Sequence, residues 1–141
     1  MSVLAEAGLD VSGVTVVDGS GLAVEDQVTC TIVADVLAHE PTEDLIAASL
    51  PIAGESGTLV ERFTDPDTVG RVRAKTGTLN TVTGLAGVAH TRIEDDARFA
   101  LVANVAPSER IPIEAVVAQE TLVELLVSHP VLPDVSGLGP R

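Results

Sequence analysis

Three segments that follow one another with only short links constrain the fold of this chain most strongly. Residues 71–76 alternate charged and uncharged residues, Val82 to His90 is apolar with small residues, and Arg98 to Val105 is strongly apolar. Such runs predict strands, and the charged turn 92–96 predicts that the last two form a hairpin. Neighbouring strands with links this short favour an antiparallel sheet covered by helices, which is an α+β architecture.

The predicted helices flank these strands. Thr29 is a suitable N-cap for a helix over residues 30–38, which carries apolar side chains at helical spacing. Residues 42–50 predict a second short helix capped by Thr42, and residues 112–128 predict a final helix with one mainly apolar side. Residues 130–141 hold three prolines and two glycines, which predicts a loose C-terminal tail.

Three smaller features complete the predicted organisation. The β-branched run Val14 to Val17 predicts a further strand near the N-terminus. The segment from Val60 to Phe63 predicts a short helical turn. Cys30 is the single cysteine, so no internal disulfide is possible, and we expect it on a buried helix face as a small hydrophobic residue.

Composition limits the classes of partner. The formal net charge of −13 argues against nucleic acids and against a polybasic membrane contact. No apolar run reaches the roughly 18 residues that suggest a membrane span, and the N-terminus has no signal-peptide pattern. His39, His90 and His129 lie far apart without metal-ligand spacing, so we expect neither a metal nor a cofactor.

The only lysine, Lys75, lies in the run Lys-Thr-Gly-Thr at the end of the first predicted strand of the sheet. A phosphate-binding loop would need glycine directly before the lysine and again five positions earlier, where this chain has Ala74 and Val69. A phosphate-binding loop is therefore excluded. Two interpretations stay open, which are a solvated lysine on an ordinary hairpin strand and a binding site for an anionic ligand.

Strand geometry restricts the second interpretation. In a strand, Arg71, Arg73 and Lys75 point to one face, whereas Thr76 points to the other. Lys75 and Thr76 can act on one ligand only if the strand is a sheet edge and an extended peptide lies alongside it. Gly77 would then leave the approach open, and the hydroxyls of Thr76 and Thr78 would reach the end of the peptide, where the lysine favours a carboxylate.

Four blocks of sequence, in this order and at these spacings, carry a resemblance to a known family. They are Asp18-Gly19-Ser20-Gly21-Leu22, the segment Leu50 to Leu59, the segment Gly70 to Leu79, and Gly84-Leu85-Ala86-Gly87. The pattern resembles the C-terminal part of the class C low-molecular-mass penicillin-binding proteins, which are D-alanyl-D-alanine carboxypeptidases and endopeptidases. One departure is Ala23, where the family usually has serine.

The resemblance implies a fold and a set of roles. Residues 1–129 would form the C-terminal part of one penicillin-binding-protein or β-lactamase-like transpeptidase domain. Lys75 would orient and polarise the catalytic cleft, and Thr76, Gly77 and Thr78 would bind substrate, with the Thr78 N–H as an oxyanion donor. The implied ligands are peptidoglycan peptides ending in D-Ala-D-Ala and β-lactams, and the implied location is extracytoplasmic, in the cell envelope.

The chain lacks two of the three catalytic motifs of the resembling family. No serine has a lysine three residues on, and no Ser-x-Asn occurs. We therefore expect this chain to be the C-terminal portion of a longer serine peptidase and to be inactive alone. The alternative is a noncatalytic peptide-binding module of the same fold. We also expect the strand Arg98 to Val105 to expose an apolar edge that favours aggregation.

Overall fold

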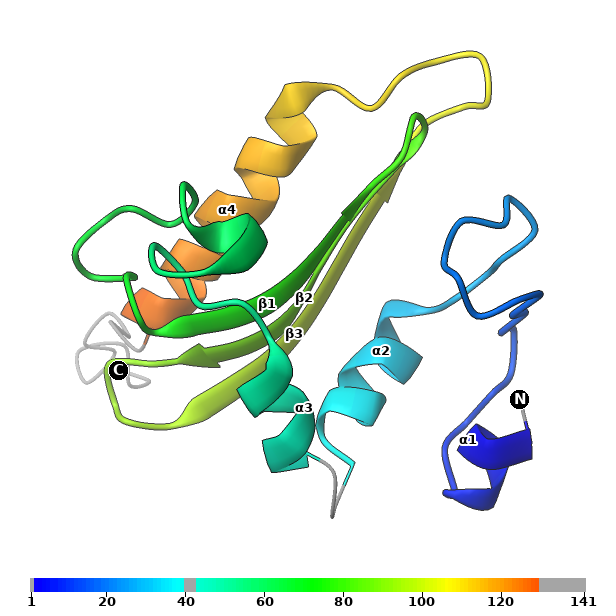
Figure 1. Ribbon diagram of the computed structural model, residues 1–141, viewed down its shortest axis with the longest axis horizontal. Helices are drawn as coiled ribbons and strands as arrows, with labels where there is room; N and C mark the ends of the chain where they lie inside the picture. Colours follow the sequence, from blue (N-terminus) through cyan, green and yellow to red (C-terminus); the bar gives the residue numbers. More distant parts are fainter. Residues whose placement is uncertain (1, 40–42, 130–141) are drawn as a thin grey trace, which may run out of the picture.

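The computed structural model, which describes residues 2–39 and 43–129, has one sheet with helices on both faces (Figure 1). In chain order the elements are α1 (Ser2–Glu6), α2 (Cys30–Leu37), α3 (Glu43–Ser49), the 3-10 helix η1 (Gly57–Leu59), β1 (Val72–Thr78), β2 (Val82–His90), β3 (Asp96–Asn104) and α4 (Ile113–Ser128). Within the described ranges, no helix has both the length and the apolar character needed to cross a bilayer. The predicted α+β class is confirmed.

The sheet has the order β1-β2-β3, and both pairings are antiparallel. In register, Ala74 lies opposite Gly87, and Gly87 lies opposite Phe99. The predicted hairpin is confirmed, although β3 begins at Asp96, two residues before the predicted start, because Asp96 pairs with His90 at the end of β2. Among the described strands, β1 forms one edge of the sheet and β3 forms the other.

Gly87 allows β1 and β2 to approach closely. A Cβ atom added there would lie 2.0 Å from the carbonyl oxygen of Arg73 and 2.7 Å from the Cα atom of Ala74. Both contacts are with backbone, so they could be relieved only by moving the strand. The small residue in the Gly84 to Gly87 block is therefore a requirement of the strand pairing itself.

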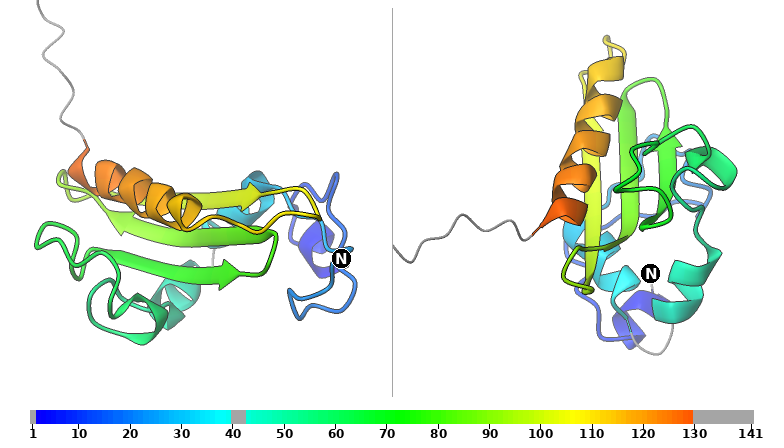
Figure 2. Two further views of the ribbon diagram at one scale, coloured as in Figure 1. Left: turned by 90° about the horizontal axis from the view of Figure 1, so that it is seen from above. Right: turned by 90° about the vertical axis from the view of Figure 1, so that its left-hand side faces the viewer.

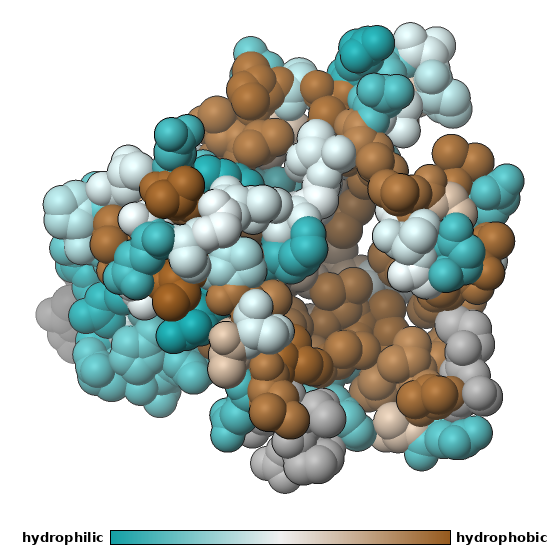
Figure 3. All heavy atoms as spheres, viewed as in Figure 1, coloured by the Kyte–Doolittle hydropathy of each residue, from teal (hydrophilic) through white to brown (hydrophobic). Residues whose placement is uncertain are grey.

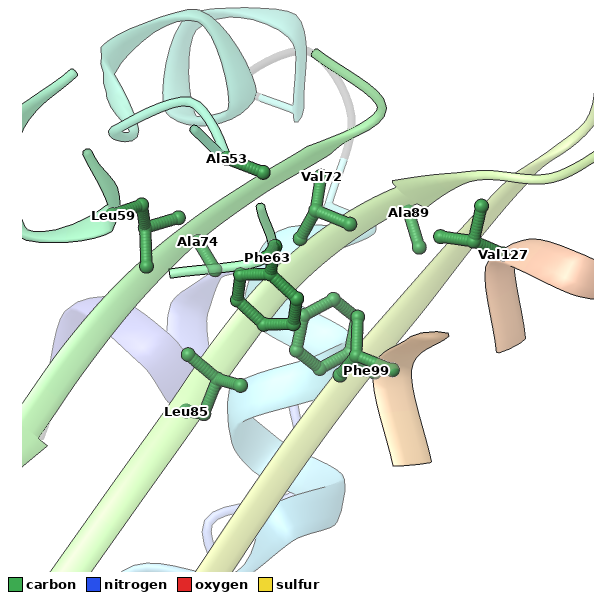
Figure 4. Packing of buried hydrophobic residues seen from close by; sticks show 10 residues of the cluster. Ala53, Leu59, Phe63, Val72, Ala74, Leu85, Ala89, Phe99 and Val127 are labelled. Atoms are coloured by element: carbon green, nitrogen blue, oxygen red, sulfur yellow. The ribbon is translucent and has the colours of Figure 1, made fainter. Parts of the chain in front are cut away.

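The two faces of the sheet carry different helices. Helix α4 lies along one face, and α2 and α3 lie on the other (Figures 1 and 2). The core is on the α4 side, where aliphatic side chains surround the two phenylalanines (Figure 4). Its buried members are Ala53, Leu59, Phe63, Val72, Ala74, Leu85, Ala89, Phe99, Val123 and Val127.

The helix boundaries follow the expected capping chemistry. The hydroxyl of Thr29 accepts a hydrogen bond of 3.1 Å from the N–H of Ile32, as predicted for an N-cap. Helix α2 ends at Leu37, one residue earlier than predicted. Pro112 occupies the N-cap position of α4, and that helix ends at Ser128 as predicted. Thr42 and the predicted tail 130–141 lie outside the described residues.

The predicted strand over Val14 to Val17 is wrong. Only Thr15 pairs there, in an isolated bridge with Gln27. Val16 and Val17 are 40% and 59% exposed, so the segment has no apolar surface to cover it. A two-stranded contact without such a surface is too weak to extend into a regular ladder.

Two local predictions also need correction. Cys30 is exposed, because it is the first residue of α2 and burial along that helix begins only at Ile32. The helical turn predicted at 60–63 is replaced by η1, three residues earlier. Phe63 takes a left-handed conformation with φ of 55°, and its N–H donates to Glu120 Oε1 at 2.6 Å, which draws the chain off a helical path.

Candidate functional site

The candidate site lies along the outer edge of β1, and its first half is already paired. The N–H of Ala53 donates to the carbonyl of Val72 at 2.9 Å, and the N–H of Ala74 donates to the carbonyl of Pro51 at 3.0 Å. The loop at 51–53 therefore acts as a short extra strand beside the beginning of β1. Its pairing ends at Ala74, one residue before the Lys-Thr-Gly-Thr run.

The second half of this edge is open. On the inner side, His90 N–H donates to Arg71 O and Leu79 N–H donates to Val82 O, so the odd-numbered residues of β1 bond to β2. The even-numbered residues therefore direct their N–H and C=O groups away from β2. The N–H of Thr76 and the N–H and C=O of Thr78 lie where an extended peptide could pair with them, whereas the C=O of Thr76 accepts from the Lys75 ammonium.

The side chains of β1 alternate as predicted. Val72 and Ala74 are fully buried on the α4 face, whereas Lys75 is exposed and lines a groove on the opposite face. The Nζ atom of Lys75 donates to the carbonyl of Thr76 at 2.5 Å. Among the described residues Lys75 has no carboxylate partner, so its charge is available to an anion.

Two pairs of hydrogen-bonded threonine hydroxyls lie at this edge. Thr76 Oγ1 donates to Thr58 Oγ1 at 3.0 Å, and Thr58 belongs to η1. Thr78 Oγ1 lies 3.0 Å from Thr83 Oγ1, across the turn between β1 and β2. The two threonines predicted to bind a carboxylate are therefore each backed by a second threonine.

A buried glutamine extends the second pair into the protein. Thr83 Oγ1 lies 3.4 Å from Gln119 Oε1, and Gln119 Nε2 donates to the carbonyls of Thr83 and Leu101 at 3.1 and 3.3 Å. Sequence reasoning missed Thr58, Thr83 and Gln119. A signal existed for Gln119, since it lies at helical spacing between Val116 and Val123 on the packed side of α4.

Gly77 keeps the approach to the edge free. A Cβ atom added at Gly77 would meet no atom within 4 Å. The adjoining groove has a volume of about 490 Å³ and is almost entirely apolar, and Lys75, Thr76 and Gly77 are among the residues that line it. Apolar side chains gather over α2 and α3 and in the hollow beside them (Figure 3).

The Asp18 to Leu22 block forms a surface turn. Asp18 Oδ1 accepts from Ser20 N–H at 2.8 Å, and Ser20 Oγ accepts from Leu22 N–H at 3.0 Å. The hydrogen bond from the backbone N–H of Ser20 lowers the pKa of the Asp18 carboxyl, because the ionised form is the better acceptor. The hydroxyl of Ser20 is thus engaged in holding the turn.

The arrangement brings together groups that can bind an extended anionic ligand. It offers one ammonium group, two hydroxyls and an unpaired strand edge, which together match an extended peptide with a carboxylate end. Within the described residues no group of three or more His, Cys, Asp or Glu side chains is placed to hold a metal ion. No serine–lysine pair at the spacing of an acylated nucleophile exists in the sequence.

Comparison with known proteins identifies longer relatives. The chain is 38% identical over 132 residues to carboxypeptidase DacB of Mycolicibacterium smegmatis and 37% identical over 124 residues to carboxypeptidase Rv3627c of Mycobacterium tuberculosis. These alignments cover 84% and 81% of this chain, but only 28% and 27% of the two relatives. The chain thus spans less than a third of their length.

Solved structures agree with this relationship. Penicillin binding protein 4 (dacB) from Haemophilus influenzae superposes with a TM-score of 0.77 at 26% identity, over 91% of this chain and 30% of that protein. The same protein in complex with a β-lactam gives a TM-score of 0.76 at 25% identity. The predatory endopeptidase Bd3459 from Bdellovibrio bacteriovorus, at 21% identity and a TM-score of 0.66, shows the same fold.

The family model of these enzymes covers most of the chain, from residue 1 to residue 121. It therefore includes the three strands of the sheet, the open edge of β1 and α4 as far as Thr121. Both the predicted family and the predicted fold are confirmed. The chain belongs to the D-Ala-D-Ala carboxypeptidase 3 (S13) family.

Proposed function

We propose that this chain is the substrate-binding portion of a serine-type D-alanyl-D-alanine carboxypeptidase, which hydrolyses the terminal peptide bond of peptidoglycan peptides. The observation that carries the proposal is the open edge of β1 from Lys75 to Thr78. Pairing by the 51–53 loop stops at Ala74, so the unpaired edge coincides with the residues expected to bind substrate.

The substrate would lie as an extended strand along this edge. Its terminal carboxylate would accept hydrogen bonds from the hydroxyl of Thr78 and from that of Thr76, which would turn away from Thr58, with the Lys75 ammonium close by. Bonds of this charge-assisted kind are stronger than neutral ones. The N–H of Thr78 points away from β2 and would stabilise the oxyanion of the tetrahedral intermediate.

The nucleophile would come from a part of the enzyme that this chain does not include. Oxyanion donors act only on an intermediate that a nucleophile has formed, and neither Ser-x-x-Lys nor Ser-x-Asn occurs here. The relatives are more than three times longer than the region matched, which leaves room for both motifs. Alone, the chain would bind substrate and β-lactams without forming an acyl-enzyme.

Binding of a D-Ala-D-Ala peptide tests the site directly. The chain would be labelled with ¹⁵N and titrated with N-acetyl-D-alanyl-D-alanine and, separately, with its C-terminal amide. We expect the acid to shift the amide resonances of Lys75 to Thr78 and the amide to shift them far less. Equal shifts with both ligands, or shifts only elsewhere, would overturn the proposed site.

A threonine-to-valine substitution in the site, compared with one outside it, tests whether the Thr78 hydroxyl contacts the ligand. Thr78→Val removes the hydroxyl at nearly constant volume, and we expect it to weaken binding of the acid about tenfold, as for the loss of one charge-assisted hydrogen bond. Thr121→Val is the control, because Thr121 is exposed on α4 and its hydroxyl donates to Val117 O. A similar loss in the control would show that the effect is not specific.

Labelling with a fluorescent penicillin distinguishes a portion of an enzyme from a noncatalytic peptide-binding module. We expect no covalent label on this chain, and a stoichiometric label would refute the argument from the missing nucleophile. The alternative is a noncatalytic peptide-binding module, favoured by the absence of Ser-x-x-Lys. A longer product of the same gene that becomes labelled at a serine would support the enzyme, and the peptidoglycan substrate would then place it outside the cytoplasm.

A further inference from the structure

The α4 face of the sheet contains a polar pair inside an otherwise apolar core. Thr83 is 1% exposed and Gln119 is 4% exposed, and their neighbours in the core include Leu85 and Val123 at 1% each. Buried polar groups are costly unless their hydrogen bonds are satisfied. This pair is satisfied, and its outer end touches Thr78, the residue proposed to bind a carboxylate.

The orientation of the Gln119 amide follows from its surroundings. Its Nε2 atom faces two carbonyl oxygens, those of Thr83 and Leu101, and both need a donor. Turning the amide over would bring its oxygen against these two carbonyls, which is repulsive. The Oε1 atom therefore faces the Thr83 hydroxyl and can only accept from it.

Thr83 has one hydroxyl proton and two acceptors for it. One is Gln119 Oε1 at 3.4 Å and the other is Thr78 Oγ1 at 3.0 Å. If the proton goes to Gln119, Thr78 must donate inward to Thr83 and presents only lone pairs to a ligand. If the proton goes to Thr78, the Thr78 proton is free to point outward.

A carboxylate can accept hydrogen bonds but cannot donate them when ionised, so it selects the second arrangement. We propose that Thr83 is a positioning residue for carboxylate recognition, whose hydroxyl proton rests on Gln119 in the free protein and turns to Thr78 when an anion binds. No bond is made or broken in this step, because two hydroxyl groups only rotate. The inference rests on the proposed function, in which Thr78 holds the carboxylate of the peptide.

Substitutions of Thr83 and Gln119 should then have different effects on the affinity for the acid peptide. Thr83→Val keeps the volume but removes the donor to Thr78, so the acid peptide should bind about fivefold more weakly. Thr83→Ser restores the hydroxyl and should restore binding. Gln119→Met removes the competing acceptor, so the acid should bind at least as tightly as to the unchanged chain, even if the variant is less stable.

The test measures binding of N-acetyl-D-alanyl-D-alanine and its amide by ¹⁵N titration of the full chain. A residue that only supported the fold would weaken acid and amide binding alike, and Gln119→Met would then resemble Thr83→Val. We expect instead that Thr83→Val lowers the preference for the acid over the amide. The double variant Thr83→Val with Thr78→Val should bind no more weakly than Thr78→Val alone.

The possible failures are distinguishable. If Thr78→Val weakens acid binding but Thr83→Val does not, the positioning role is overturned while the proposed site stands. A loss in Gln119→Met as large as in Thr83→Val would also overturn it. If the unchanged chain does not prefer the acid, the proposed function and this inference both fail. Thermal unfolding of each variant identifies any that do not fold, and Thr83→Ser is the conservative replacement that keeps the test decisive.

Discussion

The two faces of the sheet differ in how completely this chain covers them. On the α4 face, Val72, Ala74 and Leu85 are almost fully buried, and the 51–63 segment and α4 close over them. On the other face, α2 and α3 leave the apolar groove of about 490 Å³ beside Lys75. The same three strands build both faces through the alternation of their side chains. One face is therefore a finished core, and the other is a surface with room for more protein.

The comparison locates the proposed chemistry at the boundary between the faces. The open edge of β1 joins them, with the Thr78 hydroxyl supported from the closed side and Lys75 lying on the groove side. In the proposed enzyme, the closed side fixes the hydroxyl of Thr78 through Thr83.

Gly87→Ala should have the largest effect. The new Cβ atom would overlap the backbone of Arg73 and Ala74, which lies at 2.0 and 2.7 Å, so β1 would have to leave β2. Gly84→Ala is the control on the groove face, since its nearest neighbour would be Leu101 O at 3.8 Å. We expect Gly87→Ala to abolish cooperative thermal unfolding and Gly84→Ala to keep it. Equal melting curves for the two variants would show that the two faces of the sheet tolerate an added methyl group equally well.

Matched truncations on the helices should differ by about 1.5 kcal/mol. Val123 on α4 is 1% exposed, so Val123→Ala removes two buried methyl groups and leaves a cavity, at a cost of about 2 kcal/mol. Val33 on α2 is half-buried and lines the groove, so Val33→Ala should cost about 0.5 kcal/mol. Urea unfolding measures both, and equal losses would mean that the groove face is as well packed as the core.

The free edge of β3 should promote self-association. Val102 is 38% exposed on the groove face, and strands with such unpaired edges tend to pair with other chains. Val102→Lys should shift the protein towards the monomer in size-exclusion chromatography at high concentration. Val24→Lys, at a residue 92% exposed in a loop, makes the same change in charge as a control. A monomeric unchanged chain would contradict the expected aggregation.

Sequence patterns predicted the features that are set by residues close together in the sequence. Alternation and turn chemistry located β1, β2 and β3 to within two residues, and the lone Lys75 pointed to the candidate site. The strand at Val14 to Val17 was a wrong prediction because β-branched residues alone do not supply a partner strand. Burial of Cys30 was wrong because its helix extends beyond the elements that cover it.

The side chains that support Thr76 and Thr78 from behind could not be predicted in the same way. Thr83 and Gln119 are 36 residues apart, and Thr58 and Thr76 are 18 apart. Helical spacing could have indicated that Gln119 lies on the packed side of α4, but not that a threonine lies opposite it. Pairs of this kind depend on how the elements pack, which a single sequence does not specify.

The smallest effect should come from the charged end of the groove face, at His90. Its Nδ1 lies 2.9 Å from Asp96 Oδ1 and its Nε2 lies 3.1 Å from Glu94 Oε2, and these hydrogen bonds raise the pKa of His90 above its ordinary value of 6.5. Because the pKa is raised in the folded state, the stabilisation is fully present below pH 6.5 and is lost as the pH rises through the folded-state pKa.

His90→Asn should therefore destabilise the protein at pH 6 and have little effect at pH 9. The side chain is 39% exposed and its partners are more exposed, so the difference at pH 6 should be only a few tenths of a kcal/mol. It should shrink further in 1 M salt, which screens exposed ion pairs. Urea unfolding across this pH range provides the measurement. A difference that grew as the pH rose would show that neutral rather than protonated His90 stabilises this end of the sheet.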